Sequence, residues 1–178
     1  MIEVARYSEQ KRKDLFRATS QKMHVHEAVI EKDFWVCWVL DYLFNDCPWK
    51  SMLVFKGGTS LSKAYGLIDR FSEDIDLILD WHVIGYSSSE PWEERSNTQQ
   101  DKFGKQANLQ TMEFLAEAFT PQLQLDLEKR LGEVIPIEPV EQEVRIDYPQ
   151  SFISEGLLSQ IKLEIGPLAE PVPNEARA

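Results

Sequence analysis

The stretch that decides the fold runs from residue 55 to residue 79 and reads FKGGTSLSKAYGLIDRFSEDIDLIL. The apolar run MLVF at residues 52–55 predicts a buried strand, which the KGGTS sequence then interrupts. A helical pattern resumes over residues 60–67, and DIDLILD at residues 74–80 predicts a second strand. We therefore expect a strand, a glycine turn, a helix and a second strand in close succession.

The glycine turn has the composition of a phosphate-binding loop. Gly57 and Gly58 let the backbone approach a ligand closely or take a positive φ. Thr59 and Ser60 then begin a helix, whose free N–H groups and positive dipole end favour an anion such as a triphosphate. The turn does not match the Walker A pattern, so the sequence predicts a different kind of nucleotide site.

Two carboxylates follow on the second strand. Asp74 and Asp76 share one face because side chains alternate along a strand. Paired carboxylates are hard oxygen ligands suited to Mg²⁺, which usually also takes substrate phosphates as ligands. A glycine pair alone is usually a turn, and an Asp-x-Asp pair alone is usually solvated. Together, in this order, they indicate phosphoryl or nucleotidyl transfer.

The rest of the chain predicts helices and strands without a regular alternation. Helices are expected at 8–22, with Ser8 as N-cap, at 25–44, and at 99–130 with a break near Pro121. Two β-like runs within 133–148 and a strand at 160–166 follow, and residues 82–98 form a long loop of the kind that often covers a site. This order favours an α+β domain with a mixed sheet and helices packed on it.

Length and charge exclude several classes of protein. The 178 residues suit one domain, and the net charge of −11 argues against a protein that coats DNA, although it leaves room for a local positive site. No apolar run is long enough for a transmembrane helix, and the N-terminus lacks the apolar region of a signal peptide. We therefore expect a cytoplasmic protein with no membrane partner.

The motifs resemble a known family. KGGTSLSK followed by RFSEDIDL is similar to the nucleotidyltransferase-toxin family typified by AbiEii, in the polymerase β-like nucleotidyltransferase superfamily. IEKDFWVCWVL at 30–40 resembles the family's helix ahead of the glycines. IKLEIG at 161–166 resembles its later strand, which carries a functional Lys and often an acidic residue. The resemblance implies a polymerase β-like nucleotidyltransferase fold.

The resemblance also implies a domain layout. A nucleotidyltransferase domain would span 1–166, with N-terminal helices at 8–44 and a catalytic core at 52–166. Relatives continue into a mostly helical C-terminal portion, so we expect the proline-rich tail at 167–178 to lead into a further helical region. This interpretation leaves the activity of the present chain open.

The activity that the resemblance implies is that of a Mg²⁺-dependent toxin in a toxin–antitoxin system. It would transfer a nucleotide from an NTP to an RNA acceptor, tRNA ends being one known target class. A two-metal site would serve the reaction, with Mn²⁺ as the alternative ion. The protein partner would be a cognate antitoxin.

Carried over residue by residue, the resemblance assigns most of the site. Asp74 and Asp76 would bind the metal, Lys162 would neutralise phosphate charge, and Glu164 would be the third carboxylate, which helps to activate the attacking hydroxyl. The alternative for the last two is an ion-pair face on an edge strand. The triphosphate would be held by the glycine turn, namely Gly57, Gly58, Thr59 and Ser60. Nearby cations are candidate phosphate partners, namely Lys56, Lys63 and Arg70. The alternative for these three cations is that they are simply solvated.

The sequence is also compatible with other functions. A truncated, inactive module that binds an antitoxin would share the sequence pattern. A glycosyltransferase that uses its Asp-x-Asp to hold a metal–nucleotide-sugar is disfavoured, because two helices come first and glycines precede the aspartates. We expect the charged triplet at 31–33 to support the site as a buried or half-buried polar cluster. Trp81 and Trp92 could stack a base, but packing is the simpler expectation.

Overall fold

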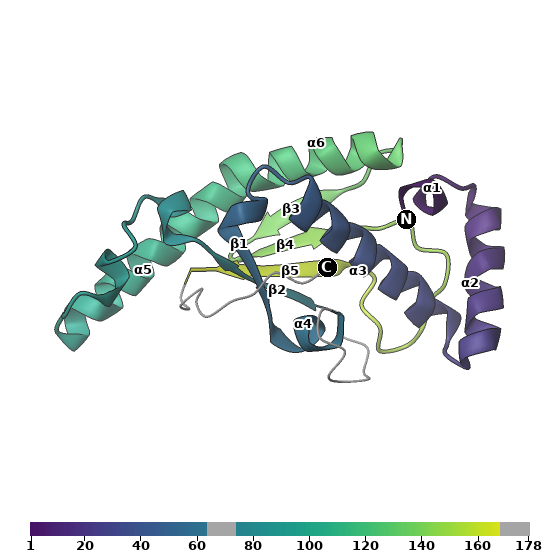
Figure 1. Cartoon of the computed structure of the whole chain (residues 1–178), viewed down its shortest axis with the longest axis horizontal. Helices are drawn as coiled ribbons and strands as arrows, with labels where there is room; N and C mark the ends of the chain where they lie inside the picture. The colour runs from purple at the N-terminus through teal and green to yellow at the C-terminus, as the bar shows by residue number, and fades with distance from the viewer. Residues whose placement is uncertain (64–73, 168–178) are drawn as a thin grey trace.

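The structure is a computed structural model that describes residues 1–63 and 74–167 (Figure 1). Its centre is a five-stranded mixed sheet in the order β1-β2-β5-β4-β3. β2 and β5 are parallel, and the other neighbours are antiparallel. The strands are β1 (Leu53–Lys56), β2 (Asp74–Leu79), β3 (Ile137–Val140), β4 (Glu143–Ile146) and β5 (Ile161–Gly166). The expected α+β fold with a mixed sheet is confirmed.

One of the N-terminal helices begins at its predicted N-cap. The first two helices are α1 (Ile2–Ala5), which the sequence pattern did not indicate, and α2 (Glu9–Met23). The Ser8 hydroxyl accepts the Lys11 N–H at 3.4 Å, so the predicted N-cap of α2 is confirmed. α3 (Glu27–Asn45) follows and supplies much of the core. α4 (Gly57–Lys63) begins at the first glycine rather than at Ser60.

A long, nearly continuous helical segment runs along the β3 side of the sheet and projects beyond it (Figure 1). α5 (Asn97–Phe114) and α6 (Thr120–Leu131) are joined by a π-helical turn, η4 (Leu115–Phe119). The expected break near Pro121 is not found. The helix is continuous there, and its backbone widens locally into one π-helical turn just before the proline. The remaining elements of the described residues are short 3₁₀ turns, namely η1 (Lys50–Met52), η2 (Trp81–Ile84) and η3 (Glu90–Trp92).

The sheet has one apolar face and one polar face. On β5, Ile161, Leu163 and Ile165 are at most 2% exposed and belong to the same core cluster as Trp35 and Trp38 of α3. The alternate residues of β5 are half-buried or exposed. β2 and β4 follow the same alternation in their first residues. Because side chains alternate along a strand, this burial pattern fixes which residues face away from the core.

The predicted long loop is partly ordered by aromatic packing. Trp81 is 6% exposed, and its ring contacts Tyr86 and Phe103. Packing is therefore the role of Trp81, as expected, whereas Trp92 is 54% exposed. No helix in the described part of the chain is long and apolar enough to cross a membrane.

Candidate active site

The polar face of the sheet carries a row of charged residues across four strands. Lys56 on β1 is opposite Asp76 on β2, Asp76 is opposite Glu164 on β5, and Glu164 is opposite Glu143 on β4. Residues in register on neighbouring strands point to the same face. The structure thus brings the predicted residues Asp76 and Glu164 together, although 87 residues lie between them in the chain.

A second row lies one alternation away. Asp74 is opposite Lys162, and Lys162 is opposite Arg145 on β4. All four residues predicted from the two motifs, Asp74, Asp76, Lys162 and Glu164, therefore occupy adjacent positions on one face. β5 is an internal strand between β2 and β4. The alternative expectation, that Lys162 and Glu164 lie on an edge strand, is therefore wrong.

The glycine turn is built around Asp76. Gly57 has φ +76°, a conformation that glycine adopts without steric cost. A Cβ atom on Gly57 would lie 1.9 Å from Asp76 Oδ2 and 2.7 Å from its Cγ. The carboxylate therefore packs directly against the glycine backbone, which explains physically why the turn and the Asp-x-Asp pair occur together.

Two hydroxyl groups close the turn onto the second strand. The buried Thr59 hydroxyl donates to the backbone carbonyl of Asp74, and the Ser60 hydroxyl donates to the Gly57 carbonyl at 2.9 Å. Both side chains are thus occupied within the site, so any contact they make with a phosphate would come from their backbone N–H groups. Gly58 lies between these residues and is half-buried.

Lys162 is the electrostatic centre of the polar face. Its Nζ lies 3.4 Å from a Glu143 oxygen, 3.5 Å from a Glu164 oxygen and 4.0 Å from Asp74 Oδ1. Partial burial acts to lower the pKa of Lys162, but the charges of the three carboxylates outweigh burial and raise the pKa above its ordinary value. The side chain is therefore a fixed cation beside the predicted metal ligands.

Glu143 and Arg145 were not among the predicted site residues. Arg145 donates to Glu143 Oε2 through its Nε at 3.2 Å and its Nη2 at 3.1 Å. Burial acts to raise the pKa of Glu143, but the bonds from Arg145 and the nearby Lys162 lower it overall. The alternation in EQEVRIDY places both on one face. The order of strands, which no local pattern reveals, brings that face to the site.

The other predicted cations are placed differently. Lys56 is exposed at the end of β1, beside Asp76 in the register. Lys63 forms an ion pair with Asp33 of α3, so its ammonium group is engaged with a carboxylate. Arg70 lies outside the described residues, as does the predicted helix beyond Lys63.

The charged triplet of α3 supports the site indirectly. Glu31 is fully buried and accepts the backbone N–H groups of Ser151 and Phe152 at 2.9 Å. Lys32, also fully buried, donates to the Leu158 carbonyl at 2.9 Å. These bonds hold the segment that leads into β5, while Asp33 holds α4 through Lys63. The expected supporting role of the triplet thus has a structural basis.

The two carboxylates fit a magnesium ion whose coordination shell is completed by phosphate oxygens. Within residues 1–63 and 74–167, no three His, Cys, Asp or Glu side chains converge as a full metal centre. Asp74 and Asp76 nevertheless offer two carboxylates, and Asp74 Oδ1 is buried without a hydrogen bond from any described residue. Mg²⁺ is commonly bound through one or two carboxylates together with waters and substrate phosphates.

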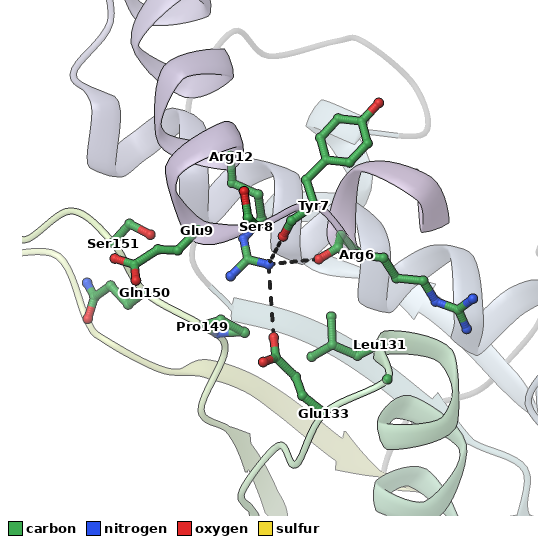
Figure 2. A pocket seen from close by; sticks show the side chains of 12 residues that line it. Arg6, Tyr7, Ser8, Glu9, Arg12, Leu131, Glu133, Pro149, Gln150 and Ser151 are labelled. Atoms are coloured by element: carbon green, nitrogen blue, oxygen red, sulfur yellow. Dashed lines mark hydrogen bonds and ion pairs between the residues drawn. The ribbon is translucent and has the colours of Figure 1, made fainter.

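Two hollows on the surface of the described residues differ in their relation to the predicted site. One, of about 380 Å³, adjoins the charged row and is lined by residues that include Lys56, Gln142, Glu143, Glu164 and Gly166. The other, of about 510 Å³, contains none of the predicted site residues (Figure 2). There the buried Arg12 donates to the Ala5 and Tyr7 carbonyls at 2.9 and 2.8 Å, which fixes the turn between α1 and α2.

Comparison with known proteins identifies a family. The family model described as the nucleotidyl transferase AbiEii toxin of type IV toxin–antitoxin systems matches residues 38–178. No curated protein and no solved structure gives a match. The matched span includes the glycine turn, both aspartates and β5, and begins within α3, after its charged triplet. A match over most of the chain, with its motifs gathered on one sheet face, means that the protein belongs to the AbiEii family of nucleotidyltransferase toxins.

Proposed function

We propose that the protein is a Mg²⁺-dependent nucleotidyltransferase that moves a nucleoside monophosphate from an NTP to a hydroxyl group of an RNA acceptor, with tRNA as the leading candidate. The observation that carries the proposal is the packing of Asp76 against Gly57, with Asp74 tied to Thr59 by a hydrogen bond. This arrangement places a turn able to approach phosphates next to two carboxylates.

The glycine turn would bind the triphosphate. At Gly57, the missing Cβ and the positive φ let the backbone and a ligand approach closely. Lys56 beside the turn is exposed and offers a cation to a phosphate oxygen. Lys63 is paired with Asp33, so its help would require exchange of a carboxylate for a phosphate.

Asp74 and Asp76 would hold the ion. When bound, Mg²⁺ or Mn²⁺ neutralises the charge that develops on the phosphates, and a pair of such ions can serve both the attacking and the leaving oxygen. The residues of the chain supply the geometry of this site. Asp76 is fixed by Gly57 and by its place in β2, and Asp74 keeps an oxygen without a hydrogen bond from the described residues.

Lys162 and Glu164 would act on the other side of the aspartates. The Lys162 ammonium group, with its raised pKa, stays charged at neutral pH and is suited to neutralise phosphate oxygens. The Glu164 side chain is 47% exposed and lies on the same face, so it is open to an acceptor hydroxyl. We assign it the role of accepting the proton of that hydroxyl.

A protein of this activity would need restraint in the cell. Membership of a toxin–antitoxin family suggests an antitoxin partner. We therefore propose that a cognate antitoxin binds the protein and that unrestrained transfer of nucleotides inhibits growth.

The proposal is tested by incubating the protein with Mg²⁺, total tRNA and each of the four labelled NTPs. Labelled RNA is expected with the unchanged protein and with Asp101→Asn, which alters an exposed carboxylate on α5. Asp76→Asn should abolish labelling. Full labelling by Asp76→Asn would refute the assignment.

Calorimetry with Mg²⁺ and NTP distinguishes the enzyme from the alternative of an inactive module that binds only an antitoxin. The enzyme should bind the complex of metal and nucleotide, and Asp76→Asn should weaken that binding. A well-folded sample that binds no nucleotide and labels no RNA would favour the interaction module.

A further inference from the structure

Lys162 is held by carboxylates from three neighbouring strands. Asp74 comes from β2, Glu164 from β5 itself and Glu143 from β4. The three distances are unequal, and the shortest, 3.4 Å, is to Glu143. At 4.0 Å from Asp74 Oδ1, the ammonium group is beyond hydrogen-bond distance of that atom. Lys162 therefore leans away from Asp74 toward β4.

Glu143 is itself fixed in place. Two nitrogen atoms of Arg145 donate to Glu143 Oε2, which leaves Oε1 to face Lys162. A guanidinium group that donates twice to one carboxylate restricts its rotation more than a single ammonium group does. The order along the face is thus Arg145, Glu143, Lys162 and then Asp74.

Glu143 is separated from the two aspartates by one strand. β5 lies between β4 and β2, and strands in a sheet are about 4.8 Å apart, so two strand spacings separate Glu143 from the Asp-x-Asp pair. The contact of Glu143 toward the aspartates is with Lys162, whose ammonium group also lies 4.0 Å from Asp74 Oδ1.

Building on the proposed function, we propose that Glu143, supported by Arg145, is a positioning residue that holds the Lys162 ammonium group off Asp74. Without the Glu143 charge, the flexible Lys162 side chain would be drawn to its remaining partners, Asp74 and Glu164. An ammonium group on Asp74 would occupy the oxygen that the proposed metal needs. Glu143 thus keeps the Lys162 ammonium group near the aspartates but prevents it from approaching Asp74 to hydrogen-bond distance.

The contact is tested first without any assay of activity. The urea midpoint of unfolding is measured for the unchanged protein, Glu143→Gln, Lys162→Met and the double variant. Glu143→Gln should lower the midpoint when Lys162 is present, because it removes an ion-pair partner. In the Lys162→Met background the decrease should be clearly smaller, because Glu143→Gln then removes only the pairing with Arg145 and no contact with Lys162. The same decrease in both backgrounds would overturn the proposal.

The effect on transfer is tested with three substitutions. Glu143→Gln should lower kcat about 10- to 100-fold, the usual cost of a misplaced reacting group, and should leave KM for the NTP within about twofold. Glu143→Asp should recover part of kcat because it restores the charge. Glu138→Gln is the matched control, because Glu138 lies on the same face opposite Arg145 and is exposed.

The outcomes separate this inference from the proposed function. Unchanged kcat in Glu143→Gln, or an equal loss in Glu138→Gln, would overturn the positioning role while leaving the transferase intact. If the unchanged protein transfers no nucleotide, the proposed function fails, and the urea measurement alone decides whether Glu143 holds Lys162.

Discussion

Gly57 and Asp76 are in such close contact that a single methyl group on the glycine would lie 1.9 Å from Asp76 Oδ2. The antiparallel pairing of β1 and β2 produces this contact, because Lys56, the residue before Gly57, is opposite Asp76. The glycine turn and the Asp-x-Asp strand are therefore one structural unit. The Asp76 carboxylate, which we propose as a metal ligand, occupies the space that a side chain at position 57 would need.

Gly57→Ala should disable this unit. The new methyl group would displace the Asp76 carboxylate, and alanine at φ +76° costs about 1–2 kcal/mol of unfolding free energy. Transfer of nucleotide, measured with labelled NTP, should fall below a tenth of the original rate, roughly the effect of losing a well-placed reacting group.

Gly104→Ala is the control for that substitution. Gly104 lies within α5, and a Cβ atom there would meet nothing within 4 Å. Alanine should raise the unfolding free energy by about 0.5–1 kcal/mol and leave transfer unchanged. If both alanine variants kept full activity, Asp76 would not need the space at Gly57.

Thr59→Val tests the bond between the turn and Asp74. Valine keeps the shape of the buried side chain but removes the hydroxyl that donates to the Asp74 carbonyl. We expect a loss of about 1 kcal/mol in unfolding free energy, measured by urea denaturation, and a clear loss of transfer.

The comparison for Thr59→Val is Thr111→Val. Thr111 is equally buried, and its hydroxyl donates to the Ala107 carbonyl at 2.9 Å within α5. It should lose similar stability and keep its activity. Equal activity in the two variants would mean that the Thr59 bond serves stability alone.

Glu31 should give the protein a measurable dependence of stability on pH. Burial raises the pKa of Glu31 above its ordinary value of 4.5, although the backbone N–H groups of Ser151 and Phe152 and the charge of Arg12 act against it. The folded state therefore holds this proton more tightly than the unfolded state does. As pH rises from 4.5 through the raised pKa, the contribution of Glu31 to stability falls, and above that pKa it is constant.

The measurement is the difference in unfolding free energy between the unchanged protein and Glu31→Gln across that pH range. As pH rises, the unfolding free energy of the unchanged protein should fall relative to that of Glu31→Gln, because glutamine does not titrate. A difference that is independent of pH would show that Glu31 titrates alike in the folded and unfolded states.

The sequence predicted individual elements better than their arrangement. Alternation in DIDLIL and IKLEIG placed Asp74, Asp76, Lys162 and Glu164 on the polar sides of two strands, and the structure confirms both strands. Alternation acts over neighbouring residues, so the pattern is visible locally. The insertion of β5 between β2 and β4 depends on contacts across long loops, which no local pattern records.

That limit explains the residues that sequence analysis did not assign. Glu143 and Arg145 have the alternation of an ordinary strand, and only the neighbouring β5 makes them part of the site. Lys63 was expected either to contact phosphate or to be solvated, but it forms an ion pair with Asp33, which is 30 residues away on another helix. Pairing between distant charges follows from the tertiary packing.

The proposed reaction transfers the nucleotide, not the terminal phosphate, of an NTP. The most direct test gives the protein Mg²⁺, the acceptor RNA and the same NTP labelled either at the α-phosphate or at the γ-phosphate. We expect label in the RNA from the α-phosphate only, with pyrophosphate released, and none of either with Asp76→Asn. Label in the RNA from the γ-phosphate would show phosphate transfer instead, and α-label undiminished by Asp76→Asn would show that Asp76 does not serve the reaction.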